Sequence, residues 1–301
     1  SFAGLVGFKP TWGEISRFGL FAFMPTLDHV GFFTRSVSEA RVLFEKTRGY
    51  DKKDATSVMN VPFKTEKDAT LKGKKVAVLE PIFALMKNKL LIKEFHNLVD
   101  KLRQAGAVVD FVPFDKDLLA AIFPTYFILS CAEANVSNAC LTGIGFGNKE
   151  EGASYEEIVA NTRGKGFSSR IKYRLMLGQY ALKKENRNEY YDRAQKARRL
   201  IVEAVDKVLE NYDVIMLPAA PNHAPTVDKQ SEPHSEIENN FMAIANFGGN
   251  PSLTLPYFLD EGLPLGVNLT GKPFDDFNVL NIALKIEEIT GLYNLHAGLK
   301  S

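Results

Sequence analysis

The stretch KKVAVLEPIFALMKNKLLIKEFHNLVDKLRQAGAVVDFVP, residues 74 to 113, decides the fold class of the chain. Its first part, Lys74 to Glu80, is a short apolar run typical of a buried strand, and Ala107 to Pro113 is another. Between them, Leu91 to Gln104 repeats its apolar residues at helical spacing, and Gly106 separates this helix from the second strand. This order of elements predicts an α/β fold with an at least partly parallel sheet.

Outward from this unit, the pattern is helical almost throughout from Asp115 to Tyr212. Two further strands, Ser252 to Tyr257 and Leu265 to Thr270, are joined by a turn with Asp260, Glu261 and Gly262, which predicts a hairpin. Glycines break the first 35 residues into short segments, as expected for strands joined by tight turns. No linker divides the chain, so we predict a single domain over residues 1–301 with a broad helical insertion.

Composition sets further limits on function. The chain has 37 Lys and Arg against 36 Asp and Glu, so a nucleic-acid partner would need another subunit or a local basic patch. The longest uncharged apolar run, Leu118 to Ala132, is shorter than a membrane span, and we predict no membrane contact. With only Cys131 and Cys140, we expect a reducing, cytoplasmic setting and two buried thiols.

Two groups of reactive residues have simpler explanations. Ser168, Ser169 and Lys172 resemble a serine nucleophile with a lysine base, but Ser168 stands at a helix start and is expected to be an N-cap. The histidines His223 and His234 flank a loop with two acidic residues, but their spacing matches no common zinc pattern. We therefore predict no metal site.

Arg174 and Tyr126 are the residues of most interest. Arg174 lies in RIKYRLMLG, where the flanking leucines imply a packed helix, so its guanidinium requires an anion. An internal carboxylate would satisfy it as well as a ligand would, and both interpretations stay open at this point. Tyr126, by itself, is expected to be a core aromatic.

Three longer motifs carry a resemblance. Phe2 to Val37 resembles the segment that follows the nucleophile loop in the amidase-signature family, and Ala245 to Asp276 resembles the C-terminal motifs of that family. Lys165 to Leu182 is similar to a helix of the glutamine-using A subunits of tRNA-dependent amidotransferases. In the first segment the matching positions are Gly4, Gly7, Lys9, Pro10, Thr11, Thr26, Leu27, Asp28, Gly31, Thr34, Arg35, Ser36 and Val37.

The resemblance implies an amidase-signature fold, a central mixed β-sheet flanked by helices, with residues 1–301 as its C-terminal two-thirds. It also implies amide transfer from glutamine to a misacylated Glu-tRNA(Gln) or Asp-tRNA(Asn), a ligase reaction of protein biosynthesis. The implied partners are glutamine and the B and C subunits, with tRNA held mainly by the partner. No cofactor is expected on this chain, because ATP and Mg are implied for the partner subunit.

The resemblance also assigns site residues. Arg174 falls at the position that binds the substrate α-carboxylate, and Tyr126 falls at a tyrosine of the same pocket. Asn239, next to Glu238, stands where the family has an acid for the α-ammonium, and this substitution removes a charge-assisted hydrogen bond. The nucleophilic serine, the second serine and the lysine would lie upstream of Ser1, so no catalytic residue is assigned in residues 1–301, and we expect the chain to be inactive alone.

Two alternatives remain open. A hydrolytic amidase of the same family would act on another small amide without tRNA, and Asn239 makes this alternative more plausible. A non-catalytic scaffold would retain the fold without the reaction. Continuation of the protein upstream of Ser1 into a glycine- and serine-rich segment would argue against the scaffold.

Overall fold

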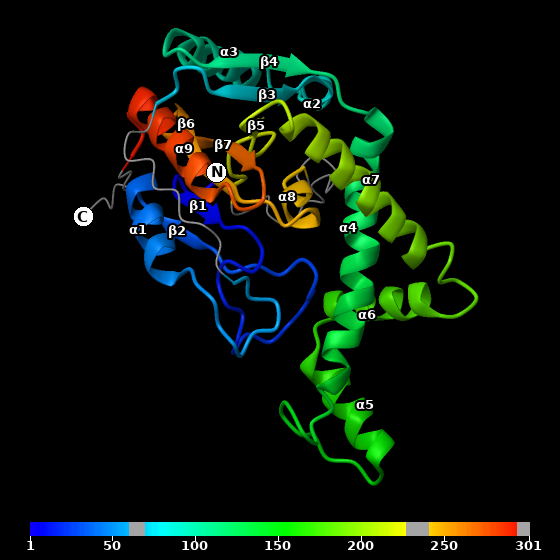
Figure 1. Ribbon diagram of the computed structural model, residues 1–301. Helices are drawn as coiled ribbons and strands as arrows, with labels where there is room; N and C mark the ends of the chain where they lie inside the picture. The colour runs from blue at the N-terminus through cyan, green and yellow to red at the C-terminus, as the bar shows by residue number, and fades with distance from the viewer. Residues whose placement is uncertain (60–69, 227–240, 294–301) are drawn as a thin grey trace. The chain divides into compact units, whose positions relative to one another are not determined.

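The computed structural model describes residues 1–59, 70–226 and 241–293 (Figure 1). The unit that decides the fold class is present, because β3 (Lys75–Leu79) and β4 (Val108–Val112) pair in parallel and α3 (Lys89–Gln104) connects them. The register sets Lys75 opposite Val108. The α3 helix buries one face, with Leu91, Phe95, Leu98 and Leu102 fully or almost fully enclosed, which confirms its predicted amphipathic pattern.

The strands of the described residues form one seven-stranded mixed sheet, in the order β2-β1-β6-β7-β5-β3-β4. Only the two pairings of β3, with β4 and with β5, are parallel, and the other four are antiparallel. The predicted α/β class with a central mixed sheet is therefore confirmed. The remaining strands are β1 (Val6–Lys9), β2 (Phe32–Thr34), β5 (Val214–Pro218), β6 (Ser252–Asp260) and β7 (Leu263–Gly271).

The predicted hairpin joins β6 and β7. Its two turn residues, Glu261 and Gly262, have φ values of 50° and 83°, the conformation of a turn whose twist matches that of the flanking strands. Asp260 pairs with Leu263 at the end of the ladder. The long hairpin places much of the C-terminal family-like motif, Ala245 to Asp276, in the middle of the sheet.

Helix ends follow the sequence in part. The α1 helix (Val37–Thr47) begins after Ser36, whose hydroxyl accepts the Glu39 N–H at 3.3 Å. The spacing of Ser36 and Glu39 is also that of a capping box. The Glu39 carboxylate, however, accepts the N–H of Arg35 and so does not complete a capping box with Ser36. At α9 (Asp276–Thr290), the sequence offers Asp275 as an acidic cap, but its side chain makes no capping hydrogen bond.

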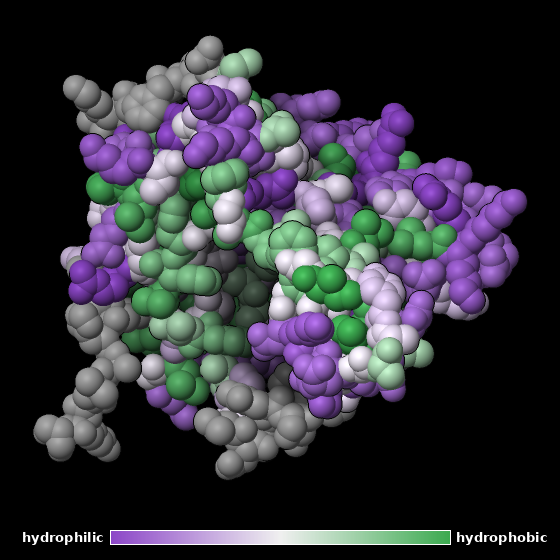
Figure 2. Space-filling model, turned by 90° about the horizontal axis from the view of Figure 1, so that it is seen from below, coloured by the Kyte–Doolittle hydropathy of each residue, from purple (hydrophilic) through white to green (hydrophobic). Residues whose placement is uncertain are grey.

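Residue contacts divide the chain into two compact units. Unit 1 contains the sheet with α1, α2 (Glu80–Leu85), α3, α8 (Ala243–Phe247) and α9. Unit 2 comprises Leu20–Asp28 and Ala121–Leu200, which hold most of α4 (Lys116–Ser137), α5 (Tyr155–Gly166), α6 (Ser169–Leu182) and the first half of α7 (Tyr191–Leu209). Unit 2 corresponds to the expected helical insertion, and the prediction of a single domain over 1–301 stays a prediction. Hydrophilic side chains cover the end of unit 2 that carries the turn between α6 and α7 (Figure 2).

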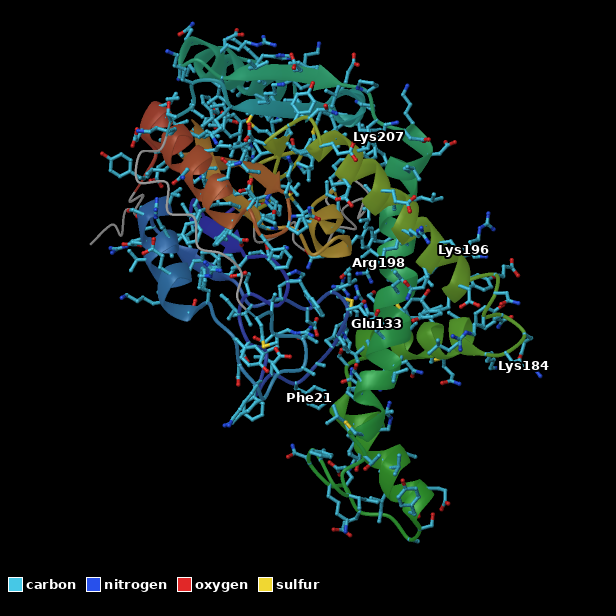
Figure 3. All side chains as sticks on the ribbon, viewed as in Figure 1. Phe21, Glu133, Lys184, Lys196, Arg198 and Lys207 are labelled. Atoms are coloured by element: carbon cyan, nitrogen blue, oxygen red, sulfur yellow. The ribbon has the colours of Figure 1, made fainter. Side chains whose placement is uncertain are left out.

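A hydrogen-bonded chain fixes the segment Leu20–Asp28 within unit 2. Thr26 donates its N–H and hydroxyl to the carboxylate of Glu133 on α4, at 3.0 and 2.5 Å. Arg198 of α7 donates to the hydroxyl and the carbonyl oxygen of Thr26, at 2.8 and 3.2 Å. The labelled side chains of Glu133 and Arg198 face this segment in Figure 3. Thr26, which belongs to the first family-like motif, therefore links two helices.

The apolar helix α4 carries Cys131, and Cys140 lies just after its end. Among the described residues, Lys116–Cys140 is the one helical stretch long and apolar enough to span a membrane, with a mean hydropathy of 1.4. Half of its apolar window is buried inside the protein, and the core helices of soluble proteins have the same length and composition, so it is weak evidence for a span. Cys131 is buried as predicted, but Cys140 is exposed at the end of this stretch, so the prediction for Cys140 is wrong.

Candidate functional site

The predicted site helices α4 and α6 pack closely within unit 2. A Cβ atom added to Gly178 of α6 would lie 2.0 Å from the carbonyl oxygen of Cys131 on α4, so only glycine allows this approach. One turn further along α4, Asn135 donates to the side-chain oxygen of Gln179 at 3.0 Å. The two contacts fix how α6 presents its neighbouring residues to α4.

Arg174 lies one turn before Gly178 and faces α4. Its guanidinium carbon is 5.5 Å from the centroid of the Phe127 ring, a cation–π contact. The side chain is half-buried, and no carboxylate within the described residues forms an ion pair with it. In this part of the chain, the internal salt bridge that the sequence left open is therefore not formed.

The charge of Arg174 also reaches the thiol of Cys131. Burial raises the pKa of this thiol, while the nearby guanidinium of Arg174 and a hydrogen bond with Ser130 act in the opposite direction. Burial dominates, so Cys131 is held in its neutral form and is an unreactive packing residue. The positive charge of Arg174 remains available to an external anion.

The other two predicted site residues are less well placed by the structure. Tyr126 is half-buried on α4, next in sequence to the Phe127 that contacts Arg174. No hydrogen bond joins Tyr126 to Arg174 within the described residues. Asn239, like the neighbouring Glu238, lies outside the described residues. Arg174 and Tyr126 are thus carried by two packed helices, and the third position is not described.

The alternative reactive groups keep their structural explanations. Ser168 is the N-cap of α6, and its hydroxyl accepts the N–H of Ile171 at 3.4 Å. Lys172 donates to the carbonyl oxygen of Gly164 at 2.9 Å, away from the serine pair. His223 pairs with Asp260 at 3.2 Å, whereas His234 lies outside the described residues. Within the described ranges, no group of three His, Cys, Asp or Glu residues could hold a metal ion.

Two polar contacts of enclosed side chains in unit 1 were not predicted from the sequence. Thr11 donates its N–H and hydroxyl to the carboxylate of Asp276, at 2.8 and 2.6 Å, and Lys9 donates its ammonium to the carbonyl oxygen of Asn250 at 2.5 Å. Burial raises the pKa of Asp276 to about 6 and lowers the pKa of Lys9 to about 7, although Asp276 partly opposes the shift of Lys9. These contacts join the first family-like motif, Phe2 to Val37, to the last, Ala245 to Asp276. The presence of all four residues in family-like motifs is the sequence signal that could have predicted the contacts.

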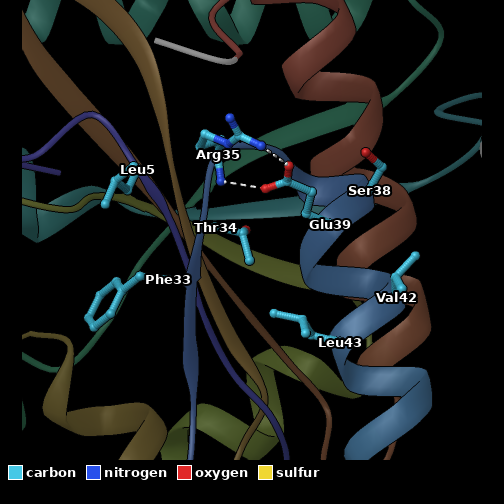
Figure 4. Close-up of a pocket in the computed structure, with 8 residues that line it drawn as sticks. All are labelled: Leu5, Phe33, Thr34, Arg35, Ser38, Glu39, Val42 and Leu43. Carbon is cyan, nitrogen blue, oxygen red and sulfur yellow. Dashed lines mark hydrogen bonds and ion pairs between the residues drawn. The ribbon is translucent and has the colours of Figure 1, made fainter. Parts of the chain in front are cut away.

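A hollow of about 640 Å³ lies beside β2 and α1 and contains none of the predicted site residues (Figure 4). Its lining is mainly apolar, including Leu5, Phe33 and Leu43. The charged pair at its rim, Arg35 and Glu39, is joined at 3.0 Å and offers no unpaired group to a ligand. The hollow is therefore a weaker candidate site than the packed pair α4 and α6.

Comparison with known proteins decides the family. A sequence profile of the Amidase family matches residues 1–280. The chain belongs to the Amidase family. The resemblance found in the three motifs is thereby confirmed, and the mixed sheet is the sheet of an Amidase-family protein.

Curated relatives refine this assignment. The A subunit of a glutamyl-tRNA(Gln) amidotransferase from Macrococcus caseolyticus is 37% identical over 301 residues, which cover 98% of this chain and 62% of the relative. The protein of the same name from Orientia tsutsugamushi is 35% identical and is covered to 61%. The chain thus spans about three fifths of the length of the curated relatives it matches.

Solved structures agree on the fold. The A subunit of the glutamyl-tRNA(Gln) amidotransferase of Thermotoga maritima superposes with a TM-score of 0.75 at 29% identity, covering 96% of this chain and 58% of that structure. A bacterial aryl acylamidase of the amidase-signature enzymes superposes with a TM-score of 0.74 at 17% identity, over 97% of this chain and 59% of its own. The second likeness shows the fold alone.

Proposed function

We propose that this chain is part of a glutamine amidase, the component of a tRNA-dependent amidotransferase that releases ammonia from glutamine to amidate Glu-tRNA(Gln) or Asp-tRNA(Asn). The names of the relatives at 37% and 35% identity support this choice within the Amidase family. The observation that carries it is Arg174, a half-buried guanidinium with an aromatic neighbour and no carboxylate partner among the described residues.

Arg174 is proposed to bind the α-carboxylate of glutamine. A guanidinium offers a planar fork of N–H donors that matches a carboxylate in two parallel hydrogen bonds. The cation–π contact with Phe127 uses the charge of the guanidinium and not its N–H donors, so these donors remain free for such a pair. Tyr126 is proposed to line the same pocket, and Asn239 to accept a hydrogen bond from the α-ammonium, which is weaker than an ion pair.

Residues 1–301 are proposed to contribute substrate binding without the nucleophile. The family resemblance places the catalytic serine, the second serine and the lysine upstream of Ser1, where the lysine would draw a proton through the second serine. The attacking serine would expel ammonia from the side-chain amide, and backbone N–H groups would stabilise the oxyanion. The chain alone is therefore proposed to be inactive, since groups that act as a unit lose most of their effect together.

The proposed partners are the B and C subunits, in the cytoplasm, with tRNA held mainly by the partner. ATP with Mg is assigned to that partner, where it would activate the tRNA-linked carboxyl group for attack by ammonia.

The test is ammonia release from glutamine by the protein with its upstream sequence, compared with the variants Arg174→Ala and Arg174→Lys. Loss of hydrogen bonds to a charged group costs about 1.5–3 kcal/mol, so Arg174→Ala should raise KM for glutamine about 10- to 100-fold. Arg174→Lys keeps the charge without the fork and should restore only part of the loss. Arg170→Ala, exposed one turn earlier on α6, is the control and should leave KM near that of the parent.

The other outcomes separate the alternatives. Turnover of simple amides without glutamine release would support a hydrolytic amidase of the same family. No turnover of any amide, with the upstream sequence present, would support a non-catalytic scaffold.

A further inference from the structure

Charge is distributed very unevenly along the chain. Residues 163–199 contain 12 Lys and Arg and only 3 Asp and Glu, a net charge of +9. Because the whole chain has 37 basic and 36 acidic residues, its other residues carry a net charge of −8. The near-neutral total therefore conceals a strongly basic segment, which lies entirely within unit 2.

Some of these cations have internal roles. Arg163 donates to the carbonyl oxygens of Asn138 and Leu141, at 2.7 and 3.2 Å, and is consumed in ordering the end of α4. Arg198 binds Thr26, and Arg174 faces Phe127. These three half-buried arginines already contact protein groups, so they are not counted among the exposed cations that follow.

Four others form what we term the basic ridge, at the turn between α6 and α7 and along the first turns of α7. They are Lys183, Lys184, Arg193 and Lys196. All four are exposed, and none forms an ion pair or a side-chain hydrogen bond within the described ranges. Figure 3 shows Lys184 at the tip of the turn and Lys196 on the outer side of α7, opposite to Arg198. The nearby Asp192 is already paired with Arg187 at 3.4 Å, and the two exposed glutamates of the turn, Glu185 and Glu189, leave the four ridge cations in excess.

Exposed aromatic residues lie along α6, which leads into the turn that carries Lys183 and Lys184. Tyr173 and Tyr180 lie two turns apart on α6 and are 59% and 48% exposed, and Tyr180 packs edge-on against Tyr190, at the other end of the turn. Exposed aromatic rings beside flexible cations are the combination that proteins use for the phosphates and unstacked bases of single-stranded nucleic acid.

We propose that the basic ridge binds the phosphate backbone of an RNA. Cations without internal partners can release the counterions of a polyanion, and this release supplies sequence-independent affinity. The choice of RNA over other polyanions rests on the proposed function, in which the acceptor of ammonia is joined to tRNA. The ridge then gives this chain its own contact with the RNA, in addition to any contact made by its partners.

The test uses the full chain and a fluorescently labelled tRNA transcript, with binding followed by anisotropy between about 50 and 200 mM salt. One variant combines Lys184→Ala, Arg193→Ala and Lys196→Ala. The control combines Lys89→Ala, Lys93→Ala and Lys101→Ala on α3, which removes the same number of exposed cations from unit 1. Thermal melts verify that both proteins are folded.

The ridge variant should bind at least about tenfold more weakly near 0.1 M salt, and the slope of log K against log salt should fall by about 2 to 3. The control should change much less. Equal losses of tRNA binding in both variants, or no loss in the ridge variant, would overturn the proposal. Binding to phosphatidylserine vesicles is measured as well, and a ridge variant that loses only this binding, and not tRNA binding, would also overturn it. Ammonia release from glutamine by the protein with its upstream sequence is measured in parallel without RNA, so a failure of the proposed reaction is distinguished from a failure of the ridge.

Discussion

The guanidinium of Arg174 and the ring of Phe127 face each other across α4 and α6, with 5.5 Å between the guanidinium carbon and the ring centroid. An aromatic face attracts the cation without using its N–H donors, whereas a carboxylate would occupy them. The contact therefore holds the arginine in place and leaves it able to bind an anion. A substitution at Phe127 tests whether this arrangement serves ligand binding.

Replacing Phe127 with leucine should weaken glutamine binding while the rate at saturation changes little. The cation–π contact is worth about 0.5–1 kcal/mol at an accessible site, so we expect KM for glutamine to rise about two- to fivefold. The measurement is steady-state ammonia release by the protein with its upstream sequence. Phe167→Leu removes an equivalent ring beside Arg163, at 4.9 Å, and should leave KM unchanged.

Gly178→Ala should strongly destabilise unit 2. The new methyl group would overlap the carbonyl oxygen of Cys131, 2.0 Å away, so α4 and α6 would have to separate. Overpacking of this kind costs about 1–3 kcal/mol or more, and the thermal midpoint should fall by several degrees. Gly164→Ala on α5 is the control, because nothing lies within 4 Å of its added Cβ, and it should be neutral or stabilising. An unchanged midpoint for Gly178→Ala would show that the two helices are not so closely packed.

Periodicity and turn residues predict part of the sheet. The apolar run at Lys75–Leu79 and the glycine turn at Gly262 have local causes, so the parallel pair and the hairpin could be inferred residue by residue. The bond between Thr11 and Asp276 could not, because 265 positions separate its partners and Asp276 has the sequence appearance of a helix cap. Its carboxylate accepts hydrogen bonds from a distant strand end, and tertiary contact overrides the local preference.

In the candidate site too, features with a local cause could be predicted from the sequence, whereas features set by tertiary contact could not. Arg174 could be singled out because an arginine among leucines needs an anion, and the structure places no described carboxylate against it. The contact of Arg174 with Phe127 depends on how α6 crosses α4. Gly178 allows the two helices to approach closely, but a glycine in the sequence does not by itself predict this approach. Cys140 was predicted to be buried, but it is exposed in the short 3₁₀ turn after α4 ends at Ser137, and no local pattern in the sequence marks this end.

Asp276→Asn should flatten the dependence of stability on acid pH. Burial raises the pKa of Asp276 to about 6, above its ordinary value of 3.8, so the folded state keeps a proton that the unfolded chain releases. The wild-type free energy of unfolding should therefore decrease as pH rises from about 4 to 6, by about 3 kcal/mol from this group. Urea midpoints at several pH values measure the slope. Asp100→Asn, exposed on α3, should retain it.

Lys9→Met should have the opposite signature, in the alkaline range. Burial lowers the pKa of Lys9 to about 7 from 10.5, so above neutrality the unfolded chain binds a proton that the folded state does not. The wild-type free energy of unfolding should therefore increase with pH above about 7, by about 2–3 kcal/mol over two pH units. Methionine cannot titrate, so this increase should disappear, and the unmet carbonyl oxygen of Asn250 should lower stability by about 1–3 kcal/mol at high pH. Urea midpoints at neutral and alkaline pH provide the measurement, with Lys72→Met, exposed before β3, as the control. A variant that keeps the alkaline increase would show that Lys9 is charged in the folded protein.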